Sequence, residues 1–270
     1  MADVTSLGRA IDPSYPTNRA LLVVMLGLGL ISGLWQSSAM WGLQTALAVF
    51  FGWALTRELD PDRESAAFVS TPMVLVCLAL GGSPQGPLFW LLLVTRLVNR
   101  TTGLKATWLD SLLVCALAFA SLPLALLTAV AFAADGWLTP PHRRHYFFAA
   151  LSLAWACYLY AGGGWTIVLD LHSTALASLV SVLGFAVIDC RQLSSTADAT
   201  GTRLLPHRIR AGQILAFFAA TCLTASSDGF FLSPFWCAVI GAATFRLISG
   251  LLERRQEPPQ PKCGQPARHG

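Results

Sequence analysis

The sequence predicts an all-helical integral membrane protein, a polytopic bundle of about ten transmembrane helices arranged as hairpins. Three observations support this class. Apolar residues make up 54% of the 270-residue chain and charged residues 12%, about half the charged share of soluble domains. The apolar residues form ten runs that lack the alternation typical of outer-membrane barrel strands. The basic residues fall in the segments between alternate runs, as the positive-inside rule requires.

The ten runs, taken in chain order, define the predicted helices. Many are shorter than the roughly 20 residues that cross a bilayer comfortably. Neighbouring neutral residues and snorkelling basic side chains can lengthen them. The runs are Ala20–Trp35, Met40–Leu55, Ala66–Leu80, Pro87–Val98, Leu109–Ser121, Leu122–Ala134, Tyr146–Ala161, Thr166–Ile188, Ile214–Ala225 and Phe230–Leu252.

Three regions follow from this pattern. Residues 1–19 form a polar, cytoplasmic segment, and we expect the first apolar run to be an uncleaved span because no convincing cleavage site follows it. Residues 20–252 form the transmembrane domain. Residues 253–270 are polar and proline-rich, which predicts a disordered cytoplasmic tail.

The stretch Trp108–Ala134 allows two topologies. It crosses the membrane twice if it breaks at Ser121–Pro123, or once if it continues, which would leave nine spans. With ten spans, all 18 Lys and Arg residues lie on one side together with both termini. The rule therefore favours ten helices with cytoplasmic termini. A bacterial plasma (inner) membrane suits so compact a chain.

The second half of the chain also resembles the first. A Phe-Trp pair precedes Arg100 and Arg246 at the same spacing, and the stretches 53–59 and 187–193 match loosely. This pattern is typical of the internal repeats found in transporters. It predicts an internal duplication, with the alternative that apolar helices of limited composition resemble one another.

The cysteines and the net charge exclude other classes. The seven cysteines form no CxxC pair, and most lie in apolar runs, where free cysteine behaves as a small hydrophobe. We expect neither a disulfide framework nor a structural metal site. The net charge of +4 is modest and is explained by topology rather than by nucleic-acid binding.

Two polar segments on the predicted cytosolic face carry the candidate ligand site. Two aspartates one residue apart can share Mg²⁺, which can in turn hold a diphosphate. Arginine and amide side chains can grip phosphate oxygens. The alternative is structural, because acidic residues around a proline suit a helix start, an aspartate can cap a helix, and arginines can snorkel to lipid phosphates. The predicted ligand-binding residues are Asp60, Asp62, Arg96, Asn99, Arg100 and Asp110, with Asp60 and Asp62 also the candidate Mg²⁺ ligands.

A second candidate lies early in the eighth run. Asp170 and His172 are ionisable groups beside an apolar segment, and such groups often relay protons in transporters. Their position near the end of the run favours an interfacial, hydrated pair as the alternative.

Three functional classes remain. A membrane-embedded, transferase-like enzyme would hold a phosphorylated or lipid-linked anionic ligand at the cytosolic site. A transporter would move a small solute or lipid, with proton coupling through Asp170 and His172. A non-catalytic subunit would use the same polar residues for topology alone. The lipid bilayer is the partner predicted in all three classes.

Overall fold

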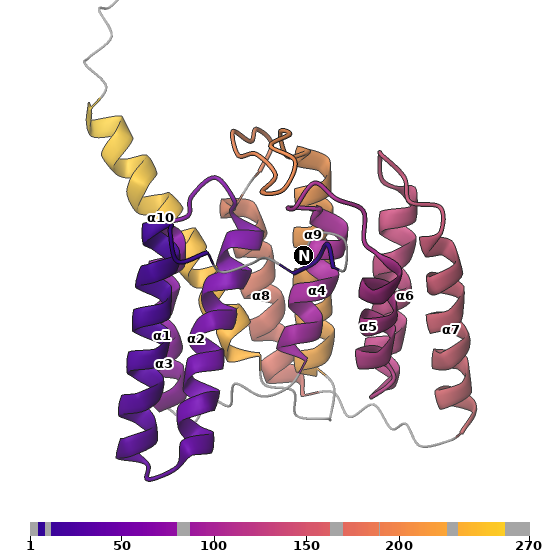
Figure 1. Ribbon diagram of the computed structural model, residues 1–270, viewed down its shortest axis with the longest axis horizontal. Helices are drawn as coiled ribbons and strands as arrows, with labels where there is room; N and C mark the ends of the chain where they lie inside the picture. The colour runs from indigo at the N-terminus through magenta and orange to yellow at the C-terminus, as the bar shows by residue number, and fades with distance from the viewer. Residues whose placement is uncertain are drawn as a thin grey trace, which may run out of the picture.

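The computed structural model describes residues 5–8, 12–79, 87–162, 170–188, 190–225 and 232–256, the last four by backbone only. Over these residues the chain forms ten α-helices and no β-strand, which confirms the all-helical prediction. Successive helices run in opposite directions (Figure 1). The helices are α1 (Pro16–Trp35), α2 (Ala39–Leu59), α3 (Ala66–Ala79), α4 (Leu88–Asn99), α5 (Trp108–Ala118), α6 (Leu122–Trp137), α7 (His145–Ala161), α8 (Leu171–Val187), α9 (Pro206–Ala225) and α10 (Ser233–Gln256).

Three of the described helices are long and apolar enough to cross a membrane, namely α1, α2 and the Ser233–Leu252 part of α10. These candidate spans indicate a membrane protein. Helices α3, α4, α5, α6 and α8 are apolar but have at most 17 residues. The shortest, α5, has 11 residues and is about 16 Å long, against about 30 Å for a bilayer core. The ten-span arrangement therefore stays a prediction.

The stretch whose crossings were ambiguous folds as two helices. Ser121 is extended, and Pro123 lies in the first turn of α6, where its missing N–H costs nothing. Ser111, near the start of α5, contacts Nε2 of His145 at 3.2 Å. Nδ1 of the same ring lies 2.8 Å from the carboxylate of Asp135, near the end of α6. The start of α5 and the end of α6 therefore both contact His145, and α5 and α6 form an antiparallel pair.

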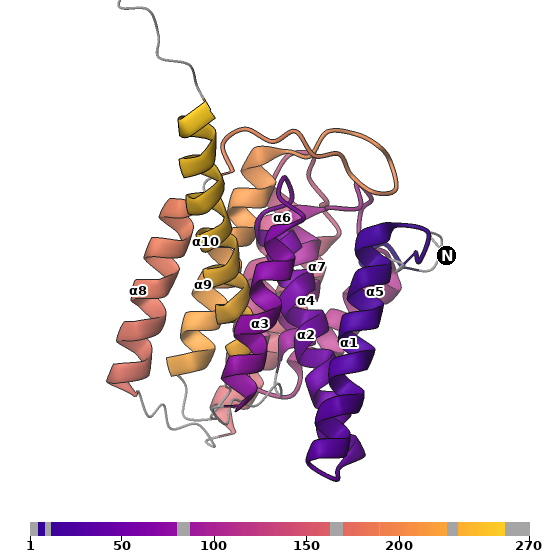
Figure 2. The same cartoon turned by 90° about the vertical axis from the view of Figure 1, so that its left-hand side faces the viewer.

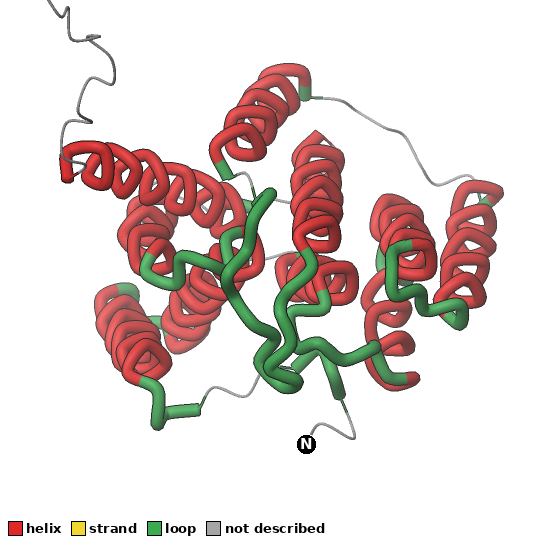
Figure 3. Tube along the Cα trace, turned by 90° about the horizontal axis from the view of Figure 1, so that it is seen from above, coloured by secondary structure: helices red, strands yellow, loops and turns green. Residues whose placement is uncertain are grey.

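Charged side chains from distant helices meet at one end of the bundle, which we call the charged end. Arg96 of α4 pairs with Glu58 of α2 at 2.9 Å, and Arg246 of α10 pairs with Asp60 at 2.6 Å. The loops of this end cross over the middle of the bundle when it is seen from above (Figure 3). The positive-inside rule assigns the basic segments to one side of the membrane. Those that the structure describes lie at this one end of the bundle.

The core centres on α4, which packs against α2, α5, α6 and α9. Of its residues only Phe89 is exposed, so the helix is buried on nearly every side, its polar residues Arg96 and Asn99 included. Trp90 is fully buried, and its Nε1–H donates to Thr128 of α6 at 2.8 Å. A buried tryptophan usually needs such a partner.

The outer surface is strongly apolar. Helices α8 and α10 lie on the outside of the bundle (Figure 2), and both expose large aliphatic side chains. Many large apolar side chains exposed on the same helices mark contact with a membrane or another protein. The exposed side chains on α1, α8 and α10 include Val23, Leu26, Leu30, Ile31, Leu34, Leu176, Leu179, Val182, Leu183, Leu247, Ile248, Leu251 and Leu252.

Two predicted boundaries differ from the observed ones, and other predicted segments lie beyond the described residues. Helix α1 begins at Pro16, inside the predicted polar segment, and α10 extends to Gln256, inside the predicted tail. Residues 257–270 and most of the predicted outer turns (81–86, 163–165 and 226–229) lie outside the described residues. The matched arginines of the predicted duplication have partners on different elements, because Arg100 pairs with Asp135 and Arg246 with Asp60. The duplication stays a prediction.

Glycines hold α1 and α2 together. A Cβ on Gly42 would lie 2.6 Å from the carbonyl oxygen of Gly29 and 3.1 Å from Cα of Gly33. Backbone atoms cannot move aside as a flexible side chain can, so the two helices need small residues here, as many membrane helix pairs do.

Replacing Gly42 with alanine should therefore force α1 and α2 apart and destabilise the protein by about 1–3 kcal/mol, the usual cost of overpacking. Gly27→Ala is the matched control, because a Cβ there meets nothing within 4 Å. Thermal unfolding in detergent measures both. Equal melting temperatures for the two variants would contradict the packing described here.

Candidate functional site

The carboxylate of Asp135 lies at the centre of the largest charged cluster. Arg100 donates to it through Nε (2.9 Å) and Nη2 (2.9 Å), and Arg208 donates to Oδ1 through Nη1 at 2.7 Å. Asp135 is fully buried, and both guanidinium groups are almost so. Buried ions are tolerated only when paired and hydrogen-bonded in this way.

The same arginines position the loop after α6. Nη2 of Arg208 donates to the carbonyls of Leu138 (2.7 Å) and Pro140 (2.9 Å). Nη1 of Arg100 donates to Pro140 as well, at 2.8 Å. The charged cluster therefore determines the course of the backbone between α6 and α7.

Two histidines border Asp135. The His142 and His145 rings lie 4.1 Å apart. Burial, together with the neighbouring His145 and Arg144, lowers the pKa of His142 to about 4. A protonated His142 is thus disfavoured in the fold at neutral pH.

Asp135, His142 and His145 bring three potential metal-ligand atoms within 4.8 Å of one another. The carboxylate, however, already accepts hydrogen bonds from Arg100 and Arg208. A dication here would lie beside two guanidinium groups, so the charges do not suit a metal. We assign this group to the ion-pair cluster.

The two aspartates predicted to share Mg²⁺ bind different protein groups. Arg246 donates to both carboxylate oxygens of Asp60, at 2.6 and 3.0 Å. Asp62 accepts from the backbone amides of Ser194 (3.0 Å) and Ser195 (2.8 Å). Burial opposes ionisation of Asp62, but the hydrogen bonds from the hydroxyl of Ser195 (2.5 Å) and from these amides outweigh it and lower the pKa of that carboxyl. A shared Mg²⁺ would have to displace Arg246.

Arg96 and Asn99 converge on Glu58, a residue that the sequence analysis did not single out. Arg96 donates to its carboxylate at 2.9 Å, and Nδ2 of Asn99 donates to its backbone carbonyl at 3.0 Å. Thr101 donates to the carboxylate at 3.0 Å. Nothing in the local sequence around Glu58 predicts that it is fully buried.

Asp110 caps a helix. It forms a capping box with Thr107 at the start of α5, the structural alternative for this residue. Its carboxylate also accepts from the amide and hydroxyl of Ser6, at 2.8 and 2.9 Å, and from the hydroxyl of Thr5. Asp110 thereby ties the described N-terminal residues to the charged end.

Asp170 and His172 lie at the exposed start of α8. Asp170 is the N-cap and accepts from the amide of His172 at 3.1 Å and from the hydroxyl of Ser173 at 2.6 Å. Both predicted proton-coupling residues are thus exposed, and the hydrogen bonds of Asp170 are those of a helix cap.

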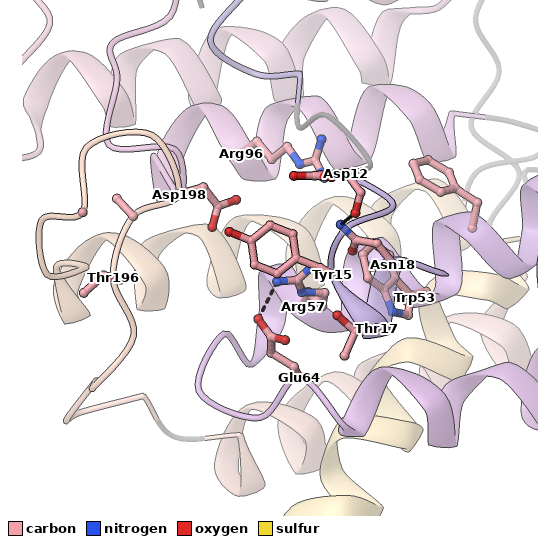
Figure 4. Close-up of a pocket in the computed structure, with 13 residues that line it drawn as sticks. Asp12, Tyr15, Thr17, Asn18, Trp53, Arg57, Glu64, Arg96, Thr196 and Asp198 are labelled. Atoms are coloured by element: carbon pink, nitrogen blue, oxygen red, sulfur yellow. Dashed lines mark hydrogen bonds and ion pairs between the residues drawn. The ribbon is translucent and has the colours of Figure 1, made fainter. Parts of the chain in front are cut away.

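Of the cavities at the charged end, two are lined by residues that the sequence predicted as ligand-binding. The larger, of about 390 Å³, has a lining of mixed charge (Figure 4). Within it Arg57 pairs with Glu64 at 2.6 Å, and Asn18 donates to the carbonyl of Asp12 at 3.0 Å. The lining comprises Asp12, Tyr15, Thr17, Asn18, Phe50, Trp53, Arg57, Glu64, Arg96, Thr196, Ala197, Asp198 and Gly201.

The smaller cavity, of about 260 Å³, is basic. Three arginines and no acidic residue are among its described lining residues, and Asp135 lies behind two of them. We call it the basic cavity. It is lined by Asn99, Arg100, Gly103, Pro140, Ala197, Thr202, Arg203, Leu204, Leu205 and Arg208.

The predicted ligand residues thus separate. Asn99 and Arg100 line the basic cavity, and Arg96 lines the larger one. Asp60, Asp62 and Asp110 line neither cavity. The sequence did not single out Arg203 or Arg208. Their only local signal is their place in the predicted inner segment between the eighth and ninth apolar runs, which also contains Arg191 and Arg210.

Comparison of the chain with known protein families, with curated proteins and with solved structures finds no match in any of the three. The site is therefore interpreted from its own chemistry.

Replacing Asp135 with asparagine would leave two buried guanidinium groups without their counter-charge. We expect a loss of about 3–5 kcal/mol in unfolding free energy, the usual result of breaking a buried pair. Asp170→Asn is the matched control, because that carboxylate is exposed and asparagine caps a helix equally well. Denaturant unfolding in detergent compares them. An Asp135→Asn variant as stable as the control would refute the role given to this cluster.

Proposed function

We propose that the chain is a multi-pass membrane protein in which all ten helices lie in the bilayer. Two observations support this. The outward faces of α1, α8 and α10 expose large aliphatic side chains, and the described ion pairs between helices gather at one end. By the positive-inside rule the charged end faces the cytosol. Both termini then lie on that side, in a bacterial plasma membrane.

We further propose that the charged end binds a phosphorylated or lipid-linked anionic ligand in the basic cavity. The observation that carries this proposal is the lining, in which Arg100, Arg203 and Arg208 occur without an acidic residue. Asp135 neutralises part of this charge, and an excess of positive charge remains. The guanidinium group of arginine can bind phosphate oxygens through two parallel hydrogen bonds. A transferase-like enzyme would use such a site to hold the diphosphate part of a substrate.

Arg203 tests this proposal most directly. Its side chain is exposed, and Nε donates to the carbonyl of Leu193 at 2.7 Å. Arg203→Gln should weaken binding of inorganic diphosphate about tenfold or more, the worth of a charged hydrogen bond. Isothermal titration in detergent measures the affinity.

Lys105→Gln is the control, because Lys105 is an exposed cation near the same end that lines neither cavity. Equal affinities for the two variants would reject the basic cavity as the binding site.

A second candidate is a non-catalytic subunit of a membrane complex. This function is favoured because most of the predicted ligand residues bind other residues of the same chain. Asp60 binds Arg246, Arg96 binds Glu58, and Asp110 caps α5. Absence of diphosphate binding in the wild-type chain would favour this function.

The proposed topology has its own test. Gln36 lies at the turn between α1 and α2, and Lys105 lies in the loop between α4 and α5. If the bundle spans the membrane, a cysteine at position 36 should react with a membrane-impermeant maleimide from outside, and one at position 105 only after the membrane is opened. The wild-type chain provides the background signal. Labelling of both positions from the same side would refute the arrangement.

A further inference from the structure

Two cysteines from opposite halves of the chain are in contact. Cys77 lies in the last turn of α3 and Cys237 near the start of α10, 160 positions apart, and their sulfur atoms are 3.3 Å from each other. Cys237 is 2% exposed and Cys77 is partly buried. No spacing motif in the sequence predicts this pair.

The helices that carry them are held closely together. A Cβ on Gly241, one turn after Cys237, would lie 2.8 Å from the backbone nitrogen of Ser70 on α3. The two backbones therefore touch on the same face that brings the sulfurs together. A disulfide bond needs sulfurs about 2.05 Å apart, so from 3.3 Å the sulfurs must approach by little more than one ångström.

We propose that Cys77 and Cys237 form a redox-active pair that closes to an intramolecular disulfide. The reaction is thiol–disulfide exchange with an incoming disulfide. Cys77, the more accessible thiol, gives up its proton and attacks one sulfur of the incoming disulfide, releasing the first thiol. Cys237 then attacks the mixed disulfide at Cys77 and releases the second thiol. Both electrons and both protons end on the reduced partner.

The pair lies at the end of the bundle opposite the charged end, because α3 ends there and α10 begins there (Figure 1). In the proposed topology this end faces the oxidising side of the membrane, where disulfides persist. The chemistry of the pair does not depend on that topology. The bond would join α3 to α10 and enclose α4–α9 in one covalent loop.

The test uses the purified full-length chain in detergent and 4,4′-dithiodipyridine, a small aromatic disulfide. Isolated cysteines should retain a pyridylthio group, whereas the pair should carry none, because closure releases the group first attached to Cys77. Mass spectrometry of unreduced peptides should find Cys77 joined to Cys237, and dithiothreitol should reverse the bond. Cys237→Ala should leave a pyridylthio group on Cys77. If that variant does not fold, Cys77→Ser replaces it and should yield no disulfide-linked peptide that contains Cys237.

Cys222→Ala is the matched control, because Cys222 is a partly buried thiol on α9 and its loss should leave the linked peptide intact. Pyridylthio groups retained on both Cys77 and Cys237 of the wild-type chain would overturn the proposal. A linked peptide that joins either residue to a different cysteine, or to a second chain, would overturn it as well.

Discussion

The interaction on which this fold depends is the burial of the Asp135 carboxylate between the guanidinium groups of Arg100 and Arg208. Each of these three ions alone would cost several kcal/mol inside an apolar bundle. Together they join α6, α4 and α9, and they fix the loop that leads to α7. Apolar helices pack in many ways with similar energies, whereas this cluster is satisfied in one arrangement.

The same solution recurs at the charged end. Arg96 joins α4 to Glu58 on α2, and Arg246 joins α10 to Asp60 at the end of α2. These pairs determine which helices are neighbours, while the apolar faces supply most of the contact area. The short helices fit this division of roles. Helix α4, with 12 residues, is too short to cross a bilayer. Other helices surround it, so its length does not have to match the thickness of the bilayer.

The helices were largely predictable from the sequence because each apolar run is a local property. Even the break at Pro123 has a local cause, since proline ends one helix and begins the next. The pairings were not predictable. Asp60 and its partner are 186 positions apart, and no local rule says which arginine will face which acid. Charge asymmetry placed the basic residues at one end, but it could not show that Asp60 and Arg96 would bind protein groups rather than a ligand.

What distinguishes the basic cavity is that its charges do not balance. Arg96 and Arg246 each have a buried carboxylate beside them, whereas Asp135 serves two arginines and the exposed Arg203 adds a third to the same lining. Stability alone would favour a second acid in this position, because it would remove the repulsion between Arg100 and Arg208. The anion proposed for this cavity would supply that missing charge. Its binding would then be favoured by the reduced repulsion between Arg100 and Arg208, the same arginines that hold the helices together through Asp135.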